Sequence, residues 1–416
     1  MRSTFNTKRL ILFSSLLSLS AWASHGTHST GASGAASAMG GTGQANYTTE
    51  TEALFRNPAL LSTNVKEAFK PRLEISSAFA KHNSQGAQAL GAAPLTLPAY
   101  TGSKDGVNVL PNIAAGMKIT DELGVALGIV GLGGSAVDYA GTGQLSDQKS
   151  EQLMYRMTPA ASYKILDNLS VGAGLVVGYS RLALNSNNST NPSKSATALG
   201  GIFGVSYSPV QNLRLGASYV TKTKFGFDSL YDLEALTGTP DNTLNHVDFQ
   251  EPAEFGIGVS YEVGNLTVAA DYRRIGWSSA LGYSDLGWAD QGIIALGGQY
   301  KMDKLSLRLG FNYGKSPFGD VTGTSGDVTQ NFQGVSAIKS LVDIANYSGF
   351  TAMTELEFDG GVGYQFTDAL SADLALVYTP TKTVTADGNS VNTGGAYIVS
   401  SKANEWAIVA GVNYQL

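Results

Sequence analysis

Short polar turns, each followed by a leucine that opens a run of alternating residues, recur from Pro71 to the end of the chain. The turns are Thr120-Asp121-Glu122, Leu166-Asp167-Asn168, Val210-Gln211-Asn212, Val263-Gly264-Asn265, Met302-Asp303-Lys304 and Thr367-Asp368-Ala369. The leucines that follow them are Leu123, Leu169, Leu213, Leu266, Leu305 and Leu370. Alternation with a period of two predicts strands with two unlike faces, and such turns join antiparallel neighbours. No composition break divides this region, so we expect one large all-β unit.

Tyrosines recur at two levels along these strands. One set precedes the turns and the chain end: Tyr163, Tyr207, Tyr261, Tyr300, Tyr364 and Tyr414. The other set shares the face of the opening leucine: Tyr179, Tyr219, Tyr272, Tyr313 and Tyr378. Two aromatic rings separated by Leu, Val and Ala are typical of a surface that crosses a lipid layer.

Longer polar connections alternate with the short turns, near residues 84–108, 136–150, 185–194, 227–247, 278–287, 317–353 and 384–398. The pattern predicts fourteen strands, from Arg72–Asn83 to Glu405–Leu416, with both ends on the short-turn side. Backbone groups in lipid must all be paired, which requires a closed sheet. We therefore expect residues 71–416 to form a 14-stranded antiparallel transmembrane β-barrel of the all-β class. The alternative, a secreted β-sandwich or propeller, does not need two outward tyrosine rings or so many long strands.

Composition agrees with a barrel and excludes other classes. Charged residues are only 14% of the chain and mean hydropathy is −0.02. No run of about 18 apolar residues follows residue 23, so a helical membrane span is excluded. The chain has no cysteine, which excludes disulfides, a lipoprotein anchor and thiolate metal sites. The net charge of −6 argues against a nucleic-acid partner.

The first 70 residues differ from the rest. Arg2, Lys8 and Arg9 precede an apolar run, which predicts a secretory signal over residues 1–23. Residues 24–70 begin with small residues and glycine and continue to the Asn57-Pro58-Ala59 turn. Such a segment lacks a strand period but can pack tightly inside another structure. We expect it to form a small N-terminal hatch, or plug, inside the lumen of the barrel.

The strand positions between the outward-facing residues carry polar groups of both signs. Among them are Arg214, Asp271, Arg273, Arg308 and Asp373, which the alternation places in the lumen. Either these charges pair across the lumen and hold the plug, or an arginine meets an anionic substrate head group. The third strand, Leu123–Ser135, is rich in glycine at its far end. These glycines either serve close packing or permit a bulge that acts as a gate.

Sequence motifs for catalysis are missing. The chain has no Gly-x-Ser-x-Gly elbow and no Walker loop, so we expect no enzyme activity, no catalytic residues and no cofactor. His25 and His28 are expected to be solvated at the mature N-terminus rather than to bind metal. Two connections, Ser229–Leu236 and Gln333–Ala345, space their apolar residues as helices do.

Short motifs in the plug and in the wall resemble those of one known family. In the plug they are Ala38-Met39-Gly40-Gly41 and Asn57-Pro58-Ala59. In the wall they are Glu251-Pro252-Ala253-Glu254 leading to Asp271-Tyr272 and Trp277-Ser278, Leu307-Arg308-Leu309-Gly310 leading to Ser316-Pro317, and Gly363-Tyr364-Gln365-Phe366-Thr367-Asp368. With these motifs the chain resembles the FadL/TodX family of outer-membrane transporters for long-chain fatty acids and other hydrophobic compounds.

The resemblance implies a bacterial outer-membrane barrel of fourteen strands with a hatch inside. It implies a ligand groove at the outer loops, an apolar pocket beside the hatch and sideways release through a kink in the third strand. Carried over to this sequence, the hatch motifs are Met39, Gly40 and Gly41 and the turn Asn57, Pro58 and Ala59, and the lateral opening is Gly131, Gly133 and Gly134.

The function expected from this resemblance is passive transport of hydrophobic molecules, with long-chain fatty acids as the leading substrate. The expected partners are that small molecule, the lipids of the outer membrane and the barrel-assembly machinery. Three other functions stay open: a plugged porin for polar solutes, a structural or adhesive surface barrel, and a lipase.

Overall fold

A closed ring of antiparallel strands forms the wall of this protein in the computed structural model, which describes residues 25–63, 69–104, 106–139, 145, 148–185, 193–228, 246–325, 329–333, 335–350 and 353–416. The main sheet has 16 strands, of which the short β2 and β15 each pair with a single neighbour and stand outside the ring. The other fourteen are β1 (Arg72–Gly91), β3 (Asn108–Lys118), β4 (Leu123–Asp138), β5 (Lys149–Leu166), β6 (Leu169–Asn185), β7 (Lys194–Val210), β8 (Leu213–Val220), β11 (Glu254–Val263), β12 (Leu266–Ile275), β13 (Gln291–Met302), β14 (Leu305–Gly314), β18 (Leu356–Gln365), β19 (Leu370–Ser390) and β20 (Gly395–Gln415).

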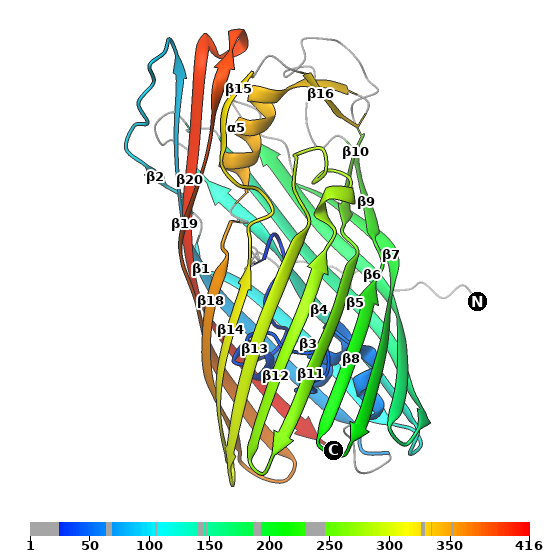
Figure 1. The fold of residues 1–416 in the computed structure, drawn as a ribbon. Coiled ribbons are helices and arrows are strands. Elements are labelled where there is room, and N and C mark those ends of the chain that lie inside the picture. Colours follow the sequence, from blue (N-terminus) through cyan, green and yellow to red (C-terminus); the bar gives the residue numbers. More distant parts are fainter. Residues whose placement is uncertain are drawn as a thin grey trace, which may run out of the picture.

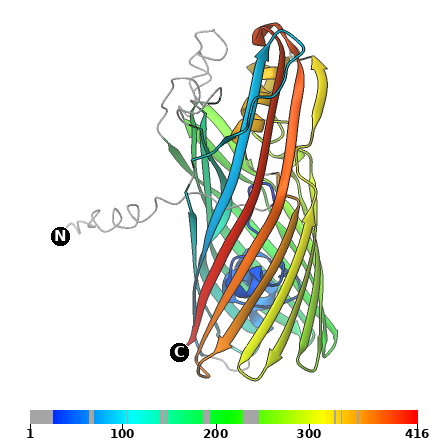
Figure 2. The ribbon, with the colours of Figure 1, turned by 90° about the vertical axis from the view of Figure 1, so that its left-hand side faces the viewer.

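Each strand of the ring pairs with its neighbour in the chain, and β20 closes the ring by pairing with β1 from Arg72↔Gln415 to Gly91↔Ala396. Figures 1 and 2 show the resulting tilted barrel. The fourteen-stranded antiparallel barrel predicted from the sequence is therefore confirmed. Among the described residues, no helix is long and apolar enough to cross a bilayer.

The short turns lie where the sequence predicts them, but several strands at the opposite, long-loop end extend further than expected. β1 continues to Gly91 instead of ending at Asn83, and β19 and β20 run through the expected connection 384–398, leaving only η5 (Val391–Thr393) between them. Residues 84–89 of β1 and 395–401 of β20 are mostly buried, so these parts of the strands lack the in-and-out alternation that marks a strand in lipid. The backbone ladder does not need that alternation, so the strands continue past the apolar band.

The outward face carries the two tyrosine rings. All eleven tyrosines named above are outward and between 36% and 53% exposed, together with Leu127, Leu296 and Phe203 of the band between them. Burial alternates with a period of two in most of the wall, as in β11 and β12. This face is the surface that meets lipid.

The N-terminal segment folds inside the lower half of the barrel, near the short turns (Figure 2). It contains α2 (Gly34–Ser37), α3 (Glu50–Phe55) and the 3-10 helix η1 (Pro58–Ser62). Ser33, Thr49 and Asn57 cap these helices by accepting hydrogen bonds from backbone N–H groups, which stabilises very short helices. We call residues 25–63 the hatch. The predicted signal over residues 1–23 lies outside the described residues.

At the long-loop end the connections form small elements above the barrel: β2 (Thr101–Gly102), β9 (Thr223–Asp228), β10 (His246–Glu251), η4 (Trp277–Ser279), β15 (Val321–Ser325), β16 (Thr329–Phe332), β17 (Val335–Ile338) and α5 (Lys339–Gly349). The helix expected over Gln333–Ala345 begins later, at Lys339, because Val335–Ile338 pairs with β16 as a strand. Its buried side is mixed rather than apolar, with Ile344 and Tyr347 in the hydrophobic core beside the polar Asp343 and Asn346. The other expected loop helix, Ser229–Leu236, lies outside the described residues.

Candidate functional site

A belt of glycines on the inner wall receives the hatch. A Cβ atom at Gly216 would overlap the carbonyl group of Gln44, and one at Gly204 would overlap the side chain of Asn57. The same holds between other wall glycines and hatch backbone or side chains. This glycine belt consists of Gly172, Gly204, Gly216, Gly256, Gly297, Gly310 and Gly361. Because glycine has no side chain, the wall lets the hatch approach at backbone distance over seven strands.

The two hatch motifs predicted from the sequence both lie on this belt. Gly40 and Gly41 have φ of +67° and +70°, and they end α2 with hydrogen bonds back to Ser37 and Ala36. Met39 beside them is buried against β13. These positive φ angles explain why the turn after α2 needs glycine.

The side chain of Asn57 forms hydrogen bonds both within the hatch and to the barrel wall. Its Oδ1 accepts the backbone N–H of Ala59 at 3.0 Å. Its Nδ2 donates to the carbonyl of Gln44 at 2.6 Å and to the carbonyl of Val205 in β7 at 3.0 Å. Pro58 then begins η1, where it removes no needed donor.

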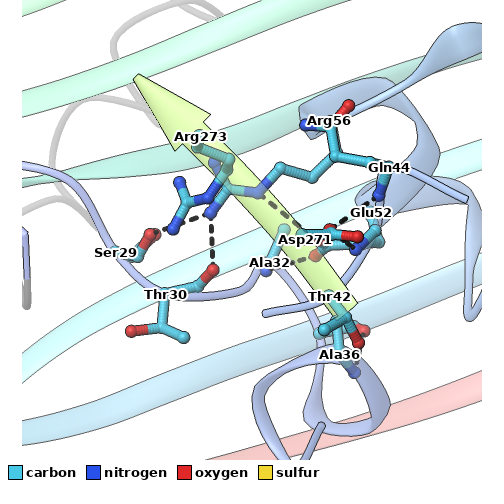
Figure 3. Close-up of polar contacts among 12 residues, drawn as sticks. Ser29, Thr30, Ala32, Ala36, Thr42, Gln44, Glu52, Arg56, Asp271 and Arg273 are labelled. Carbon is cyan, nitrogen blue, oxygen red and sulfur yellow. Dashed lines mark hydrogen bonds and ion pairs between the residues drawn. The ribbon is translucent and has the colours of Figure 1, made fainter. Parts of the chain in front are cut away.

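Buried charges fix the hatch to β12 and β11. Asp271 Oδ2 accepts the backbone N–H groups of Gly43 at 2.7 Å and Gln44 at 2.9 Å. Arg56 of the hatch donates to the carbonyl of Thr30 at 2.5 Å and to Glu254 Oε1 at 3.1 Å, and Arg273 Nη1 reaches the same oxygen at 3.4 Å. Figure 3 shows hatch residues Ser29 to Arg56 gathered around Asp271 and Arg273.

A carboxylate inside the hatch completes this network. Glu52 accepts the backbone N–H of Ala32 at 2.8 Å and lies 3.4 Å from Arg56 Nε. Burial raises the pKa of Glu52 to about 7, although Arg56 opposes the shift. Glu52, Arg56 and Glu254 are charges from two segments that satisfy one another within the lumen.

The five predicted lumen charges do not act alike. Arg308 Nη1 pairs with Asp373 Oδ1 at 2.6 Å, and Asn413 also donates to Asp373. Asp271 binds hatch backbone, and Arg273 pairs with Glu254. Arg214 is half-buried and forms no ion pair among the described residues. Every described lumen arginine other than Arg214 thus already faces a carboxylate.

The N-terminal histidines are buried, which corrects the expectation that they are solvated. His25 and His28 are each 1% exposed, and their backbones hydrogen-bond to each other. His25 Nε2 contacts Asn312 Oδ1, and His28 contacts Glu251 through Nε2 and lies 3.6 Å from Glu254 through Nδ1. The wall supplies the polar partners that solvent would give a free terminus, and nothing in the local sequence signals this.

The surroundings of His25 and His28 shift the pKa values of the two imidazoles in opposite directions. Burial, helped by the positive charge of Arg273, lowers the pKa of His25 to about 3. Burial also opposes charge on His28, but the Glu251 and Glu254 carboxylates outweigh it and raise the pKa of His28 above its ordinary value. Among the residues that the structure describes, no three His, Cys, Asp or Glu side chains are grouped to hold a metal ion.

The wall has a notch between β3 and β4. Their pairing runs only from Lys118↔Gly124 to Ile113↔Ile129, so the rest of β4 has no ladder partner on that side. The β4–β5 register shifts between Gly131 and Gly133, which leaves Leu132 as an extra residue. From Val130 to Val137 every residue of β4 is buried, so the alternation of a lipid-facing strand ends there.

Predicted glycines form this notch. Gly133 and Gly134 have φ of +132° and +153°, which side chains rarely adopt. The N–H of Gly131 donates to Asn112 Oδ1 at 2.7 Å, replacing a ladder bond. The carbonyl of Leu132 accepts the N–H of Ser29 at 2.6 Å, so the displaced strand touches the hatch terminus.

Beside the notch and the hatch, the inner wall is apolar and built from small residues. Leu110 of β3 and Tyr155 of β5 form one buried cluster with Ala38 of the hatch and with Ala78, Ala80, Leu153, Ala375, Val377, Ala407 and Val409. We call this cluster the apolar inner face. A groove of about 850 Å³ on the outer surface over β3–β7 is a different feature, because it lies among outward residues such as Leu127 and Phe203.

Aromatic side chains cover the barrel at the long-loop end. Trp277, Tyr283 and Trp288 pack at ring-centroid distances of 4.7 to 5.2 Å, and Phe318 and Phe350 extend the group. The ring of His28 lies 5.2 Å from that of Trp277, and Thr27 Oγ1 lies 3.3 Å from the Tyr283 hydroxyl. We call this group the aromatic lid. It connects the outer loops to the hatch terminus.

Comparisons with known proteins agree with this architecture. A family model described as outer membrane protein transport protein (OMPP1/FadL/TodX) matches residues 14–325. The comparison with curated proteins gave no match.

Three solved structures are similar in fold. A Pseudomonas aeruginosa FadL homologue has a TM-score of 0.69 and 18% identity, covering 94% of this chain and 99% of that one. The Pseudomonas putida toluene transporter TodX has a TM-score of 0.65 and 17% identity, covering 93% and 99%. The Ralstonia pickettii toluene transporter TbuX has a TM-score of 0.64 and 18% identity, with the same coverage of 93% and 99%. At these identities the likeness concerns the fold.

Proposed function

Because this chain belongs to the OMPP1/FadL/TodX family of outer membrane transport proteins, we propose that it is a passive channel that carries hydrophobic small molecules across the outer membrane. The protein lies in that membrane as a multi-strand barrel. Family members act as transport channels, and we propose a channel rather than an enzyme here as well. The two similar toluene transporters support an apolar substrate.

The notch in β4 is the observation that carries the proposal. A barrel in lipid keeps every strand paired on both sides, because unpaired backbone groups are costly there. This chain instead breaks the β3–β4 ladder above Ile129 and places the apolar inner face beside the break. Such a gap at membrane depth gives an apolar molecule a path from the lumen into lipid without passing through water.

The proposed route has three parts. The molecule enters past the aromatic lid, rests on the apolar inner face next to the hatch, and leaves sideways between β3 and β4 at Gly131, Gly133 and Gly134. Met39, Gly40 and Gly41 with Asn57, Pro58 and Ala59 hold the hatch on the glycine belt, so the axis of the barrel stays closed to ions. We further propose that residues 1–23 are removed as a secretory signal.

For the substrate, long-chain fatty acids and aromatic hydrocarbons are the two classes to separate. Burial of each methylene contributes about 0.8 kcal/mol, so an acyl chain of any length would be held on an apolar inner wall. A fatty acid also needs a donor for its carboxylate, and the described lumen arginines except Arg214 are already paired with acids. This favours apolar molecules without an anionic head.

Deletion of Leu132 tests the route. The deletion removes the extra residue and lets β4 pair with β5 in one register through Gly131 and Gly133. Uptake of toluene into proteoliposomes should then fall at least tenfold, while retention of toluene by the purified protein persists. Unchanged uptake would contradict lateral release, and ion conductance by the intact protein would favour a porin for polar solutes instead. Normal uptake in cells that lack the protein would favour a structural or adhesive role.

A further inference from the structure

A row of polar side chains crosses the inner wall from β14 to β1 at one level. The pairing of Asn312 with Glu357 joins β14 to β18, and the pairings of Thr379 with Glu405 and of Glu405 with His82 join β19, β20 and β1. Asp359 lies two residues from Glu357 on the same face of β18. All of these side chains are buried, and Glu357, Thr379 and Glu405 are 0% exposed.

The carboxylates of this row outnumber their donors. Glu357 Oε1 accepts from Asn312 Nδ2 at 2.8 Å, but its Oε2 has no partner. Glu405 Oε2 lies 3.0 Å from His82 Nδ1, while its Oε1 is unpartnered. No donor reaches either oxygen of Asp359, whose carboxyl faces that of Glu357. The one lysine of β19, Lys382, is bonded to Glu355 at 3.0 Å.

Two hydroxyl groups, one in the row and one on the neighbouring apolar inner face, also lack a partner. Thr379 Oγ1 lies in the row between Glu357 and Glu405 and is unpartnered. The hydroxyl of Tyr155, which is 8% exposed and comes from β5 across the lumen, is also unpartnered. Buried polar atoms in native proteins nearly always have hydrogen-bond partners, so a set of this size points to a bound group.

The row borders the apolar inner face. Ala80, Val377 and Ala407 each lie two residues from a member of the row on the same side of the strand. They belong to the cluster that includes Leu110 and Tyr155 beside the notch. A molecule with its apolar part on this cluster would hold its polar end against the carboxylates.

We propose that the row Glu357, Asp359 and Glu405 with Thr379 binds the head group of an apolar ligand that bears a protonated amine, and that it rejects carboxylates. This inference rests on the proposed function, because it specifies the substrate class of that transport route. An amine supplies donors to the unpartnered oxygens, and a charge-assisted bond of this kind is stronger than a neutral one. A fatty acid anion offers no donor to these oxygens, and any ionised carboxyl of the row would repel it.

A competition between three twelve-carbon probes tests the proposal. The full-length protein in detergent is incubated with equal amounts of dodecylamine, dodecanol and dodecanoate, isolated by gel filtration, and extracted for mass spectrometry. We expect the amine to exceed the carboxylate by roughly tenfold or more, the effect of one charge-assisted hydrogen bond. Equal retention of amine and carboxylate would overturn the proposal.

Variants locate the effect in the row. In the double variant Asp359→Asn, Glu405→Gln, the amine-to-carboxylate ratio should fall towards one, while retention of dodecanol is unchanged. Asp121→Asn, which neutralises an exposed turn residue, is the matched control and should keep the ratio. Heat-modifiable migration on electrophoresis checks that each variant is folded. The comparison of the three probes on the wild-type protein tests the proposal even if a variant does not fold.

The outcomes also separate this inference from the proposed function. If dodecanol is retained but the amine has no advantage, or if the double variant keeps the advantage, the acidic row is wrong and the transport route stands. If none of the three probes is retained, the apolar inner face is not a binding site and both proposals fail.

Discussion

Gly216 and Gly298 both lie within strands of the wall, and they differ in what stands in front of them. A Cβ atom at Gly216 would overlap the Gln44 carbonyl of the hatch, whereas nothing lies within 4 Å of one at Gly298. At the scale of the residue, a glycine therefore makes room for the hatch in one strand, whereas a glycine in another strand has no contact with it. The alternation of the strands predicts which glycines face inward, but only the folded hatch selects those that matter.

Gly216→Ala should destabilise the docked hatch by about 1 to 3 kcal/mol, the usual cost of forcing an extra methyl group into a packed site. Gly298→Ala is the matched control and should stay within about 0.5 kcal/mol. Thermal unfolding in detergent measures the difference. Equal melting temperatures for the two variants would contradict close docking at the glycine belt.

His28→Gln should loosen the hatch terminus in a pH-dependent way. The pKa of His28 is raised in the folded state, by Glu251 and Glu254 against the effect of burial, so the folded protein holds this proton more tightly than the unfolded chain. The stabilisation is complete below a pH of about 6.5, the ordinary histidine pKa, and is lost as pH rises through the folded pKa.

Hydrogen exchange of the hatch terminus at several pH values measures this effect. The wild-type protein should be better protected than His28→Gln at pH 6, and the gap should narrow at alkaline pH. Taking the difference between the two proteins removes the opposite contribution of His25, which both retain. A gap that widens with pH would show that the imidazole is neutral when docked.

At the scale of the element, β4 departs most from a regular strand. Its first half obeys the alternation, and from Val130 onward every residue is buried. The glycines at its far end are visible in the sequence, but they are compatible both with a regular, closely packed strand and with a bulged one. Only the missing β3 ladder and the positive φ angles of Gly133 and Gly134 distinguish the two.

Replacing Gly133 or Gly134 by alanine should strain the bulge by roughly 1 to 2 kcal/mol each, because these φ angles disfavour a side chain. Toluene uptake should fall with the altered strand, whereas Gly360→Ala, where a Cβ would make ordinary contacts, should leave uptake intact. Proteoliposome uptake and melting temperature are measured on the same samples. Wild-type values for both glycine variants would mean that the bulge has no role.

Elements set by lipid were predictable, and elements set by contacts between segments were not. The turns, the tyrosine rings and the strand count follow from alternation, because lipid acts on every strand in the same way. The long ends of β19 and β20, the late start of α5 at Lys339 and the burial of His25 depend on partners far away in the chain. A single sequence does not reveal such pairings.

At the scale of the whole molecule, hatch, wall and aromatic lid form one connected system. The hatch lies in the lower half of the barrel, as Figure 2 shows, and its first residues reach Trp277 and Tyr283 of the lid. Between them stand the charges of β11 and β12, which pair with the hatch rather than with each other alone. Movement of the terminus would thus affect both ends of the route.

Removal of residues 25–63 should turn the protein into an open pore. We propose that the hatch closes the barrel along its axis, so the intact protein should conduct almost no ions in planar bilayers, whereas the shortened protein should conduct steadily. Retention of dodecanol should also fall, because Ala38 no longer borders the apolar inner face. Conductance by the intact protein, or none from a folded shortened barrel, would refute the plugged arrangement.

The pairing of β1 with β20 also constrains how the protein is assembled. These are the first and last strands of the ring, so the wall stays open until the C-terminal residues arrive. The hatch precedes β1 and touches glycines in seven strands of the finished wall. We therefore expect the hatch to lie among the strands before the ring closes, and to be enclosed when β20 pairs with β1. A hatch peptide offered to a finished, hatchless barrel should fail to dock, which a pull-down with the labelled peptide would measure.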